Sequence, residues 1–216
     1  MANIFDLFRK IENERDAAVT GPGAVSFIVA GLGNPESKYT FTRHNAGFLA
    51  VDYMSQKLGF DVRRARFHAL TGECTVGGTR VLVMKPQTYM NRSGEAIREA
   101  ADFYKLPPER ILIICDDISL PVGAVRIRAK GSDGGQKGLR SIIERLGTDA
   151  FPRIKLGVGE KPSPEWDLAD WVLSTFNETD RERMFDAFGR ACDAVPVIVS
   201  GDIAAAQSRY NYNGTV

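Results

Sequence analysis

A nearly continuous apolar run at Ile111–Cys115 constrains the fold more than any other feature of this sequence. A strand with one face in water alternates apolar and polar residues, whereas this run has no polar position, so it predicts a strand buried on both faces. Such strands occupy sheets that carry helices on both sides, which predicts an α/β fold. Asp116 and Asp117 follow the run directly, at the end of the strand where open α/β sheets bind their ligands.

Helix and strand patterns alternate through the rest of the chain from residue 25. Strands are expected at about 26–32, 67–76, 79–84, 125–128 and 153–158, and helices at about 48–58, 93–104, 139–146 and 179–199, with a short last helix after Asp202. The Gly77-Gly78 pair predicts a hairpin between two of the strands, so the sheet is expected to be mixed. The prediction is a single α/β domain over residues 25–216, with a mixed twisted sheet flanked by helices.

Residues 1–24 are expected to form an N-terminal extension ahead of this domain. Ile4, Leu7, Phe8 and Ile11 recur at helical spacing, which predicts an amphipathic helix. A Gly-Pro-Gly sequence then interrupts the helical pattern before the first strand. The extension is expected to dock on the core or on a partner.

The net charge of +1 rules out a globally basic protein, but the charge is unevenly distributed. Between Leu120 and Lys161, nine basic residues stand against four acidic ones. A local basic surplus of this kind indicates a polyanion-binding face on an otherwise neutral protein. The alternative is an ordinary solvated surface of mixed charge.

The cysteines and the apolar runs bear on the cellular compartment. Cys74, Cys115 and Cys192 are widely spaced and include no C-x-x-C pair, so neither a disulfide framework nor a zinc ribbon is predicted. The sequence has no run of 18 or more apolar residues, and its N-terminus lacks the apolar centre of a signal peptide. We therefore expect a cytoplasmic protein with no membrane partner.

The connection from Gly31 to Gly47 is long, and long connections in compact domains are usually functional. It contains His44, one of only two histidines in the chain, and imidazole titrates near neutral pH. The connection opens with Gly-x-Gly, which raises the alternative of a dinucleotide-binding turn. Glu36 occupies the position of the third glycine in that pattern, which disfavours a nucleotide-dependent oxidoreductase.

A second loop, Lys130–Gly138, is rich in glycine and leads into an expected helix. Backbone N–H groups and a helix N-terminus together favour an anionic ligand. The loop lacks the Gly-Lys-Ser/Thr ending of a P-loop, so nucleotide hydrolysis is not expected.

Four stretches together resemble the bacterial-type peptidyl-tRNA hydrolase family. They are residues 31–47, 85–94 and 116–123, and the pair 131–139 with 151–159. No single stretch identifies the family, whereas the four in this order and spacing do, and the resemblance runs from about Val25 to the C-terminus. It implies a single α/β domain with a mixed sheet. It also implies hydrolysis of the ester between a peptide and the 3′ ribose of tRNA, without metal or cofactor.

The resemblance further implies roles for individual residues. The family's catalytic histidine falls on His44, and the aspartate that orients it falls on Asp116. The expected substrate-binding residues are Asn34, Tyr39, Asn45, Met90, Asn91 and Lys137. The expected tRNA-binding residues are Arg126, Arg128, Lys130, Arg153 and Lys155, of which Arg153 and Lys155 are expected to share the polar face of one alternating strand.

Two positions depart from the family pattern. The family's glycine-rich loop usually ends His-Asn-Gly, and here the sequence is Gln136-Lys137-Gly138. Lys137 therefore stands in place of an asparagine that helps to bind the substrate. Cys115 stands where some members have a histidine before the aspartate.

Ester hydrolysis requires an activated water and a stabilised oxyanion. His44 held by Asp116 can take a proton from water, while Asn34 and Asn91 can donate hydrogen bonds to a carbonyl oxygen. No Gly-x-Ser-x-Gly nucleophile elbow occurs, so direct attack by water is predicted. The alternative is a non-catalytic RNA-binding relative on the same fold, which the presence of all four residues disfavours. The expected partner is peptidyl-tRNA, bound by a monomer through its acceptor stem and 3′ end.

Overall fold

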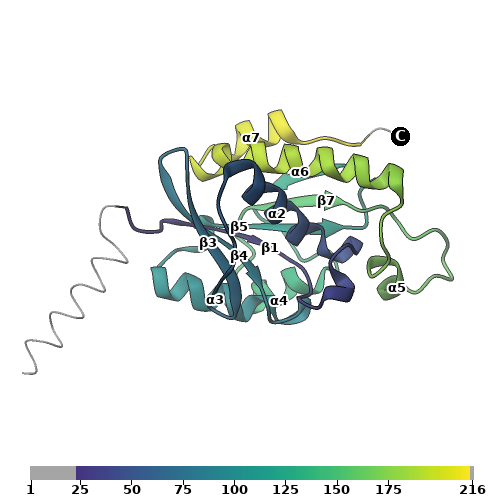
Figure 1. Ribbon diagram of the computed structural model, residues 1–216, viewed down its shortest axis with the longest axis horizontal. Helices are drawn as coiled ribbons and strands as arrows, with labels where there is room; N and C mark the ends of the chain where they lie inside the picture. Colours follow the sequence, from purple (N-terminus) through teal and green to yellow (C-terminus); the bar gives the residue numbers. More distant parts are fainter. Residues whose placement is uncertain (1–22, 215–216) are drawn as a thin grey trace, which may run out of the picture.

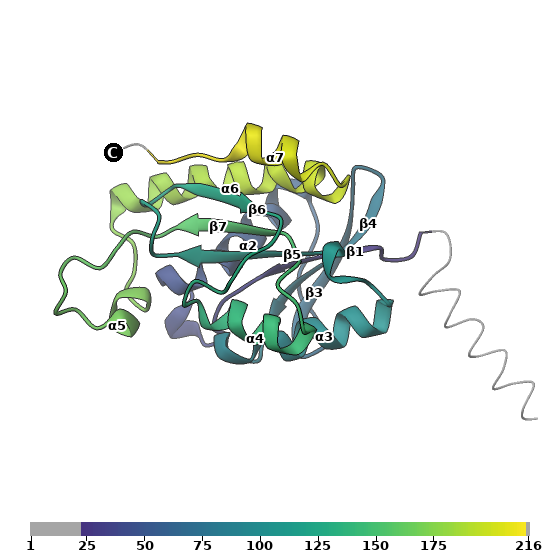
Figure 2. The same cartoon turned by 180° about the vertical axis from the view of Figure 1, so that it is seen from behind.

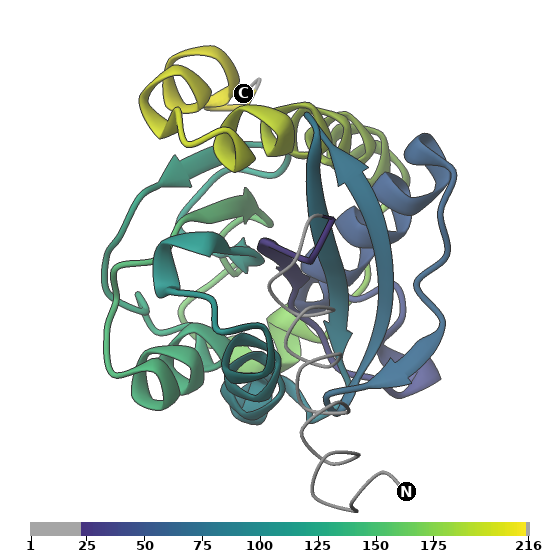
Figure 3. The same ribbon diagram turned by 90° about the vertical axis from the view of Figure 1, so that its left-hand side faces the viewer.

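The structure is a computed structural model that describes residues 23–214. The helix predicted for the N-terminal extension falls in residues 1–22, outside the described residues. The described chain forms one α/β domain, in which a sheet lies between two layers of helices (Figures 1 and 3). The predicted fold class is therefore confirmed.

Seven strands form the sheet, in the order β2-β3-β4-β1-β5-β7-β6. Their bounds are β1 (Phe27–Gly31), β2 (Arg64–Arg66), β3 (Ala69–Val76), β4 (Thr79–Pro86), β5 (Ile111–Asp117), β6 (Val125–Arg128) and β7 (Arg153–Gly157). The four central strands β4, β1, β5 and β7 are parallel, while β2, β3 and β6 pair antiparallel at the two edges. The sheet is mixed as predicted, and it also contains the three-residue strand β2, which was not predicted.

Helices cover both faces of this sheet. One layer contains α2 (Ala46–Leu58), α6 (Glu178–Val199) and α7 (Ile203–Tyr210), and the other contains α3 (Ser93–Tyr104) and α4 (Lys137–Leu146) (Figure 1). The short α5 (Leu168–Val172) lies at the end of the molecule toward which β5 and β7 point (Figure 2). Single 3-10 turns occur at η1 (Ser37–Tyr39), η2 (Arg43–Asn45), η3 (Met90–Arg92) and η4 (Pro108–Arg110).

Each face of the sheet packs into its own apolar core. Along β5, Leu112 and Ile114 contribute to the core beneath α2 and α6, whereas Ile111 and Ile113 contribute to the core beneath α3 and α4. This double burial explains why β5 has no polar residue before Asp116. It confirms the interpretation of the apolar run as a strand covered on both sides.

Gly47, in the first turn of α2, brings η2 close to the end of β5. A Cβ atom on Gly47 would lie 2.3 Å from the carbonyl oxygen of Ile114 and 2.4 Å from the backbone nitrogen of Leu32. Only a residue without a side chain permits this approach, so Gly47 is what allows α2 to begin directly against β1 and β5. His44 is consequently held beside the carboxyl end of β5.

Candidate active site

A cleft with a volume of about 560 Å³ opens beyond the carboxyl ends of the parallel strands. Its walls come from the loop after β1, from η2, η3 and α5, from the end of β5 and from the glycine-rich loop before α4. Asn34 and Asp116 both line it, because they follow β1 and end β5, two parallel neighbouring strands whose carboxyl ends meet at one rim of the sheet. The cleft is the site to which the sequence predictions apply.

His44 and Asp116 form a hydrogen-bonded pair in this cleft. The His44 Nδ1 atom lies 2.8 Å from Asp116 Oδ2, and the two side chains are only 13% and 3% exposed. Because the carboxylate accepts, Nδ1 is the protonated nitrogen of the neutral imidazole, and in that tautomer Nε2 has a lone pair. No hydrogen bond to Nε2 is made within residues 23–214. His44 is therefore arranged to accept a proton at Nε2.

Gln136 contacts the other oxygen of the same carboxylate. Its Nε2 atom donates to Asp116 Oδ1 at 3.0 Å, and its Oε1 atom accepts from the backbone N–H of Leu139 at 2.8 Å. Gln136 is thus the N-cap of α4, which begins two residues earlier than the helix predicted from Leu139. The role of Gln136 is not predictable from the sequence, because glutamine is not a preferred N-cap and no local pattern indicates its contact with Asp116.

Asn34 and Asn45 interlock at the end of β1. The Asn45 side chain accepts from the Asn34 N–H at 2.8 Å and donates to the Asn34 carbonyl oxygen at 3.0 Å. Asn34 Oδ1 accepts from the N–H of Met90 at 2.9 Å, which leaves the Asn34 Nδ2 amide free to donate to a ligand. Asn45 is only 1% exposed and does not line the cleft. Its side chain holds Asn34 in place, and the structure gives no support for the predicted contact of Asn45 with the substrate.

Of the remaining residues predicted to bind the substrate, three line the cleft and one does not. Met90, Asn91 and Lys137 line the cleft, and the exposed Asn91 side chain has no hydrogen-bond partner among residues 23–214. Tyr39 is half-buried in η1 and does not line the cleft. Tyr89, which no sequence pattern indicated, does line it.

Tyr89 adopts a strained backbone conformation at the mouth of the cleft. Its φ is +58° and its ψ is 159°, a region that residues with a side chain seldom occupy. The ring is well exposed, and its hydroxyl donates to Glu36 Oε1 at 2.7 Å. This hydrogen bond links the loop after β1 to η3 across one end of the cleft.

Asp117 and Lys155 form a second charged pair on the cleft wall. Lys155 Nζ donates to Asp117 Oδ2 at 3.0 Å, and the Ser119 hydroxyl and N–H donate to the other oxygen at 2.7 and 2.9 Å. Burial opposes ionisation of the Asp117 carboxyl, but these hydrogen bonds outweigh it and lower the pKa of Asp117 below its ordinary value. Lys155 thus lies inside the cleft.

The other residues predicted to bind tRNA have contrasting environments. Arg126 and Arg128 project from the edge strand β6, and Lys130 follows in an exposed turn. Arg153 is only 1% exposed, and its guanidinium donates to backbone carbonyl oxygens of residues 131–132, 149 and 151. This burial leaves Arg153 no surface for direct contact with tRNA, which corrects that prediction. Its hydrogen bonds instead hold the base of the glycine-rich loop.

Arg43 anchors the chain segment that carries α5. Its guanidinium lies 3.9 Å from the ring centre of Trp171 and donates to the Val158 carbonyl oxygen at 3.1 Å. It also pairs with Asp180 Oδ2 at 3.3 Å. Because Arg43 immediately precedes His44, the cleft wall formed by α5 is tied to the same turn that presents the imidazole.

No cysteine in the described residues is placed as a nucleophile. Cys115 lies next to Asp116 but is fully buried, and burial raises the pKa of its thiol well above the ordinary value. Cys74 and Cys192 do not line the cleft.

Within residues 23–214, no group of three metal-binding side chains is arranged around a common point, and no helix is long and apolar enough to span a bilayer.

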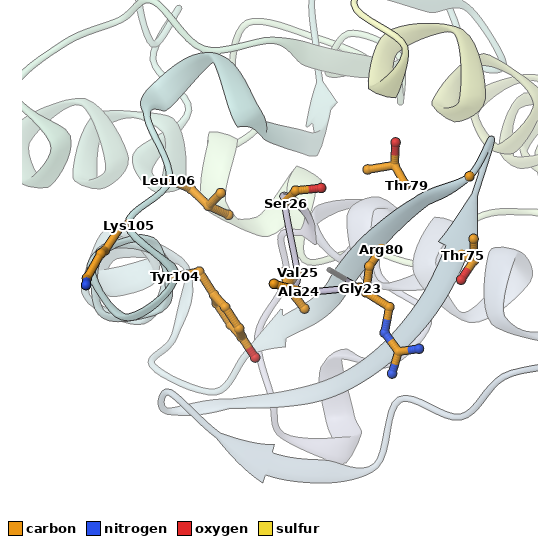
Figure 4. Close-up of a pocket in the computed structure, with 11 residues that line it drawn as sticks. Gly23, Ala24, Val25, Ser26, Thr75, Thr79, Arg80, Tyr104, Lys105 and Leu106 are labelled. Carbon is orange, nitrogen blue, oxygen red and sulfur yellow. The ribbon is translucent and has the colours of Figure 1, made fainter. Parts of the chain in front are cut away.

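A second cavity of about 550 Å³ lies at the opposite end of the sheet, where the chain enters β1 (Figure 4). Its lining residues come from positions 23–26, from the hairpin between β3 and β4, and from the end of α3. The described residues around it include no carboxylate and no imidazole. It therefore lacks the acid–base chemistry found in the first cleft.

Comparisons with known proteins agree with this geometry. A sequence model of the family described as peptidyl-tRNA hydrolase matches residues 28–215. A peptidyl-tRNA hydrolase of Caldicellulosiruptor bescii is 46% identical over 187 residues, which cover 87% of this chain and 97% of that protein. One from Lachnospira eligens is 48% identical over 185 residues, covering 86% and 99%. The crystal structure of peptidyl-tRNA hydrolase from Acinetobacter baumannii aligns with a TM-score of 0.81 at 34% identity, over 87% of this chain and 95% of that chain.

Proposed function

The chain belongs to the peptidyl-tRNA hydrolase family, and from this premise we propose that it hydrolyses the ester bond of peptidyl-tRNA with His44 as the general base. The observation that carries the proposal is the pair formed by His44 and Asp116 in the cleft, with Nε2 of the imidazole free. The products are a free peptide and a tRNA that can be charged again.

His44 acts on the attacking water. A water bound at Nε2 loses its proton to the imidazole as its oxygen adds to the ester carbonyl carbon. Asp116 holds the imidazole in the required tautomer and stabilises the imidazolium that forms. The same proton then passes to the ribose oxygen as the C–O bond to the tRNA breaks, which returns His44 to its neutral state.

Asn34 and Asn91 stabilise the oxyanion of the tetrahedral intermediate. Both line the cleft, and both have an amide donor that no group within residues 23–214 engages. Loss of one such donor typically costs about 10²–10³ in rate. Asn45 contributes indirectly, because it fixes the backbone of Asn34.

Basic residues guide the tRNA toward this centre. Arg128 and Lys130 provide exposed positive charge, Arg126 beside them is half-buried, and Lys137 and Lys155 line the cleft. These residues suit contacts with the phosphates of the acceptor stem and 3′ end, which position the substrate without reading its sequence.

We further propose that the protein acts as a monomer in the cytoplasm, where translation produces its substrate.

The assignment of His44 is tested by His44→Ala, assayed with an N-blocked aminoacyl-tRNA in the presence and absence of a chelator. We expect hydrolysis to be abolished while tRNA affinity stays near that of the wild type, since His44 is assigned to chemistry and not to phosphate contact. Near-wild-type turnover in His44→Ala would refute the base assignment. An alternative role as a non-catalytic RNA-binding protein is not favoured, because four residues suited to hydrolysis converge in one cleft.

A further inference from the structure

We propose that Gln136 is a positioning residue of the reaction, which holds Asp116 in the orientation that accepts the Nδ1 proton of His44. This inference rests on the proposed function of His44 as the base. It concerns a position at which the chain departs from the His-Asn-Gly ending of its family.

The three side chains form a continuous series of hydrogen bonds. His44 Nδ1 donates to one oxygen of Asp116 at 2.8 Å, and Gln136 Nε2 donates to the other at 3.0 Å. Among residues 23–214, these are the only side-chain donors to that carboxylate. Asp116 is almost fully buried, so water cannot readily replace Gln136 at the second oxygen.

The Gln136 amide is itself fixed in one orientation by α4. Its Oε1 atom accepts the N–H of Leu139 at 2.8 Å, and its Nε2 atom also lies 3.1 Å from the sulfur of Met90. A flipped amide would set an oxygen against the carboxylate and an NH₂ group against the backbone N–H. Both contacts would be repulsive, so the start of α4 determines that a donor faces Asp116.

Substitution can separate the helix cap made by Gln136 Oε1 from the contacts made by its Nε2 atom. Serine is a preferred N-cap but is too short to reach Asp116, so Gln136→Ser keeps α4 capped and removes the contacts of Nε2 with the carboxylate and with the Met90 sulfur. A matched control is Gly147→Ala at the other end of α4. Gly147 has a φ of +73° and open space around it, so alanine there strains the helix end without touching the cleft.

The kinetic test compares kcat and KM for these two variants and the wild type. A hydrogen bond to a charged group that is lost in a buried site corresponds to about a 10- to 100-fold change. We expect Gln136→Ser to lower kcat by about that factor with KM within about twofold, and Gly147→Ala to lower thermal stability with kcat unchanged. Equal losses of kcat in both variants would show that Gln136 acts only through the stability of α4.

The spectroscopic test follows the Nδ1 proton of His44 by NMR, and the sequence is well suited to it because it contains only two histidines. His68 is 74% exposed, so its ring protons exchange rapidly with water, whereas the His44 ring is sheltered. We expect the hydrogen-bonded Nδ1 proton to be visible in the wild type and in Gly147→Ala, and to broaden or shift in Gln136→Ser.

Should Gln136→Ser fail to fold, Gln136→Glu provides a second variant of the same shape. It retains an acceptor for the Leu139 N–H but presents a carboxylate to Asp116, and we expect a loss of kcat at least as large. An unchanged kcat in a folded variant, with an unchanged His44 resonance, would overturn the inference. That result leaves the role of His44 intact if His44→Ala is inactive, so the two hypotheses fail separately.

Discussion

The substitution Asp116→Asn tests whether hydrogen-bond direction, rather than shape, sets the state of His44. An asparagine at position 116 has one acceptor and one donor in place of two acceptor oxygens. Gln136 Nε2 is a donor of fixed orientation, so the asparagine oxygen is expected to face Gln136. Its NH₂ group then faces His44 Nδ1, which must lose its proton to accept. The proton moves to Nε2, and His44 can no longer act as a base.

The size of the effect follows from the alternative orientation of the asparagine. To restore the productive tautomer, the amide must flip and set its NH₂ group against that of Gln136, which loses one hydrogen bond and leaves two buried donors facing each other. That costs about 2–4 kcal/mol, or about 30- to 1000-fold in rate. Loss of the negative charge that stabilises the imidazolium adds to this, so we expect kcat to fall by about 10³-fold with KM little changed.

A second substitution can reverse part of this loss. In the Asp116→Asn background, Gln136→Glu replaces the fixed donor by an acceptor, so the asparagine can donate to it and turn its oxygen to His44. We expect kcat of the double variant to exceed that of Asp116→Asn by at least about tenfold, measured by release of an N-blocked aminoacyl group from tRNA. A double variant no faster than the single one would refute the reasoning from hydrogen-bond direction. A loss in Asp116→Asn as large as that in His44→Ala would instead indicate that Asp116 is the base.

Three further predictions concern charge and packing. Lys137→Ala should weaken tRNA binding and flatten the slope of log affinity against log salt by about 0.7–0.9, while kcat at saturation stays nearly constant; an unchanged slope would indicate a solvated lysine. Because the folded-state pKa of Asp117 is lowered, its contribution to stability is present above the ordinary pKa and is lost as pH falls through the lowered value. Asp117→Asn should therefore be less stable than the wild type in denaturant titrations at pH 7, with a difference that shrinks below about pH 4; a constant difference would contradict this account. Gly47→Ala should destabilise the fold by about 3 kcal/mol or more and reduce activity, because the added Cβ meets backbone of β5; a small loss of thermal stability would show that α2 can shift away.

The sequence alone was sufficient for features that depend on local pattern. The apolar run in β5 has no polar residue because both faces of the strand are covered. The burial of both faces can therefore be inferred from the residue pattern alone. The position of Asp116 at the strand end follows from the same contiguous run. The pairing of Asp116 with His44, 72 residues earlier, does not follow from any one stretch and was expected only from the resemblance carried by four stretches together.

Tertiary structure alone decided how individual polar side chains are used. Arg153 and Lys155 alternate with apolar residues in the same way, yet Arg153 is buried beneath the glycine-rich loop and Lys155 faces the cleft. Asn45 was expected to bind the substrate, but both hydrogen bonds of its side chain are made with the backbone of Asn34. Gln136 has no local pattern to mark it, and its role arises from the meeting of α4 with β5. The physical reason is the same in each case: a hydrogen bond needs a partner, and the partners of these side chains come from segments that only the folded chain brings together.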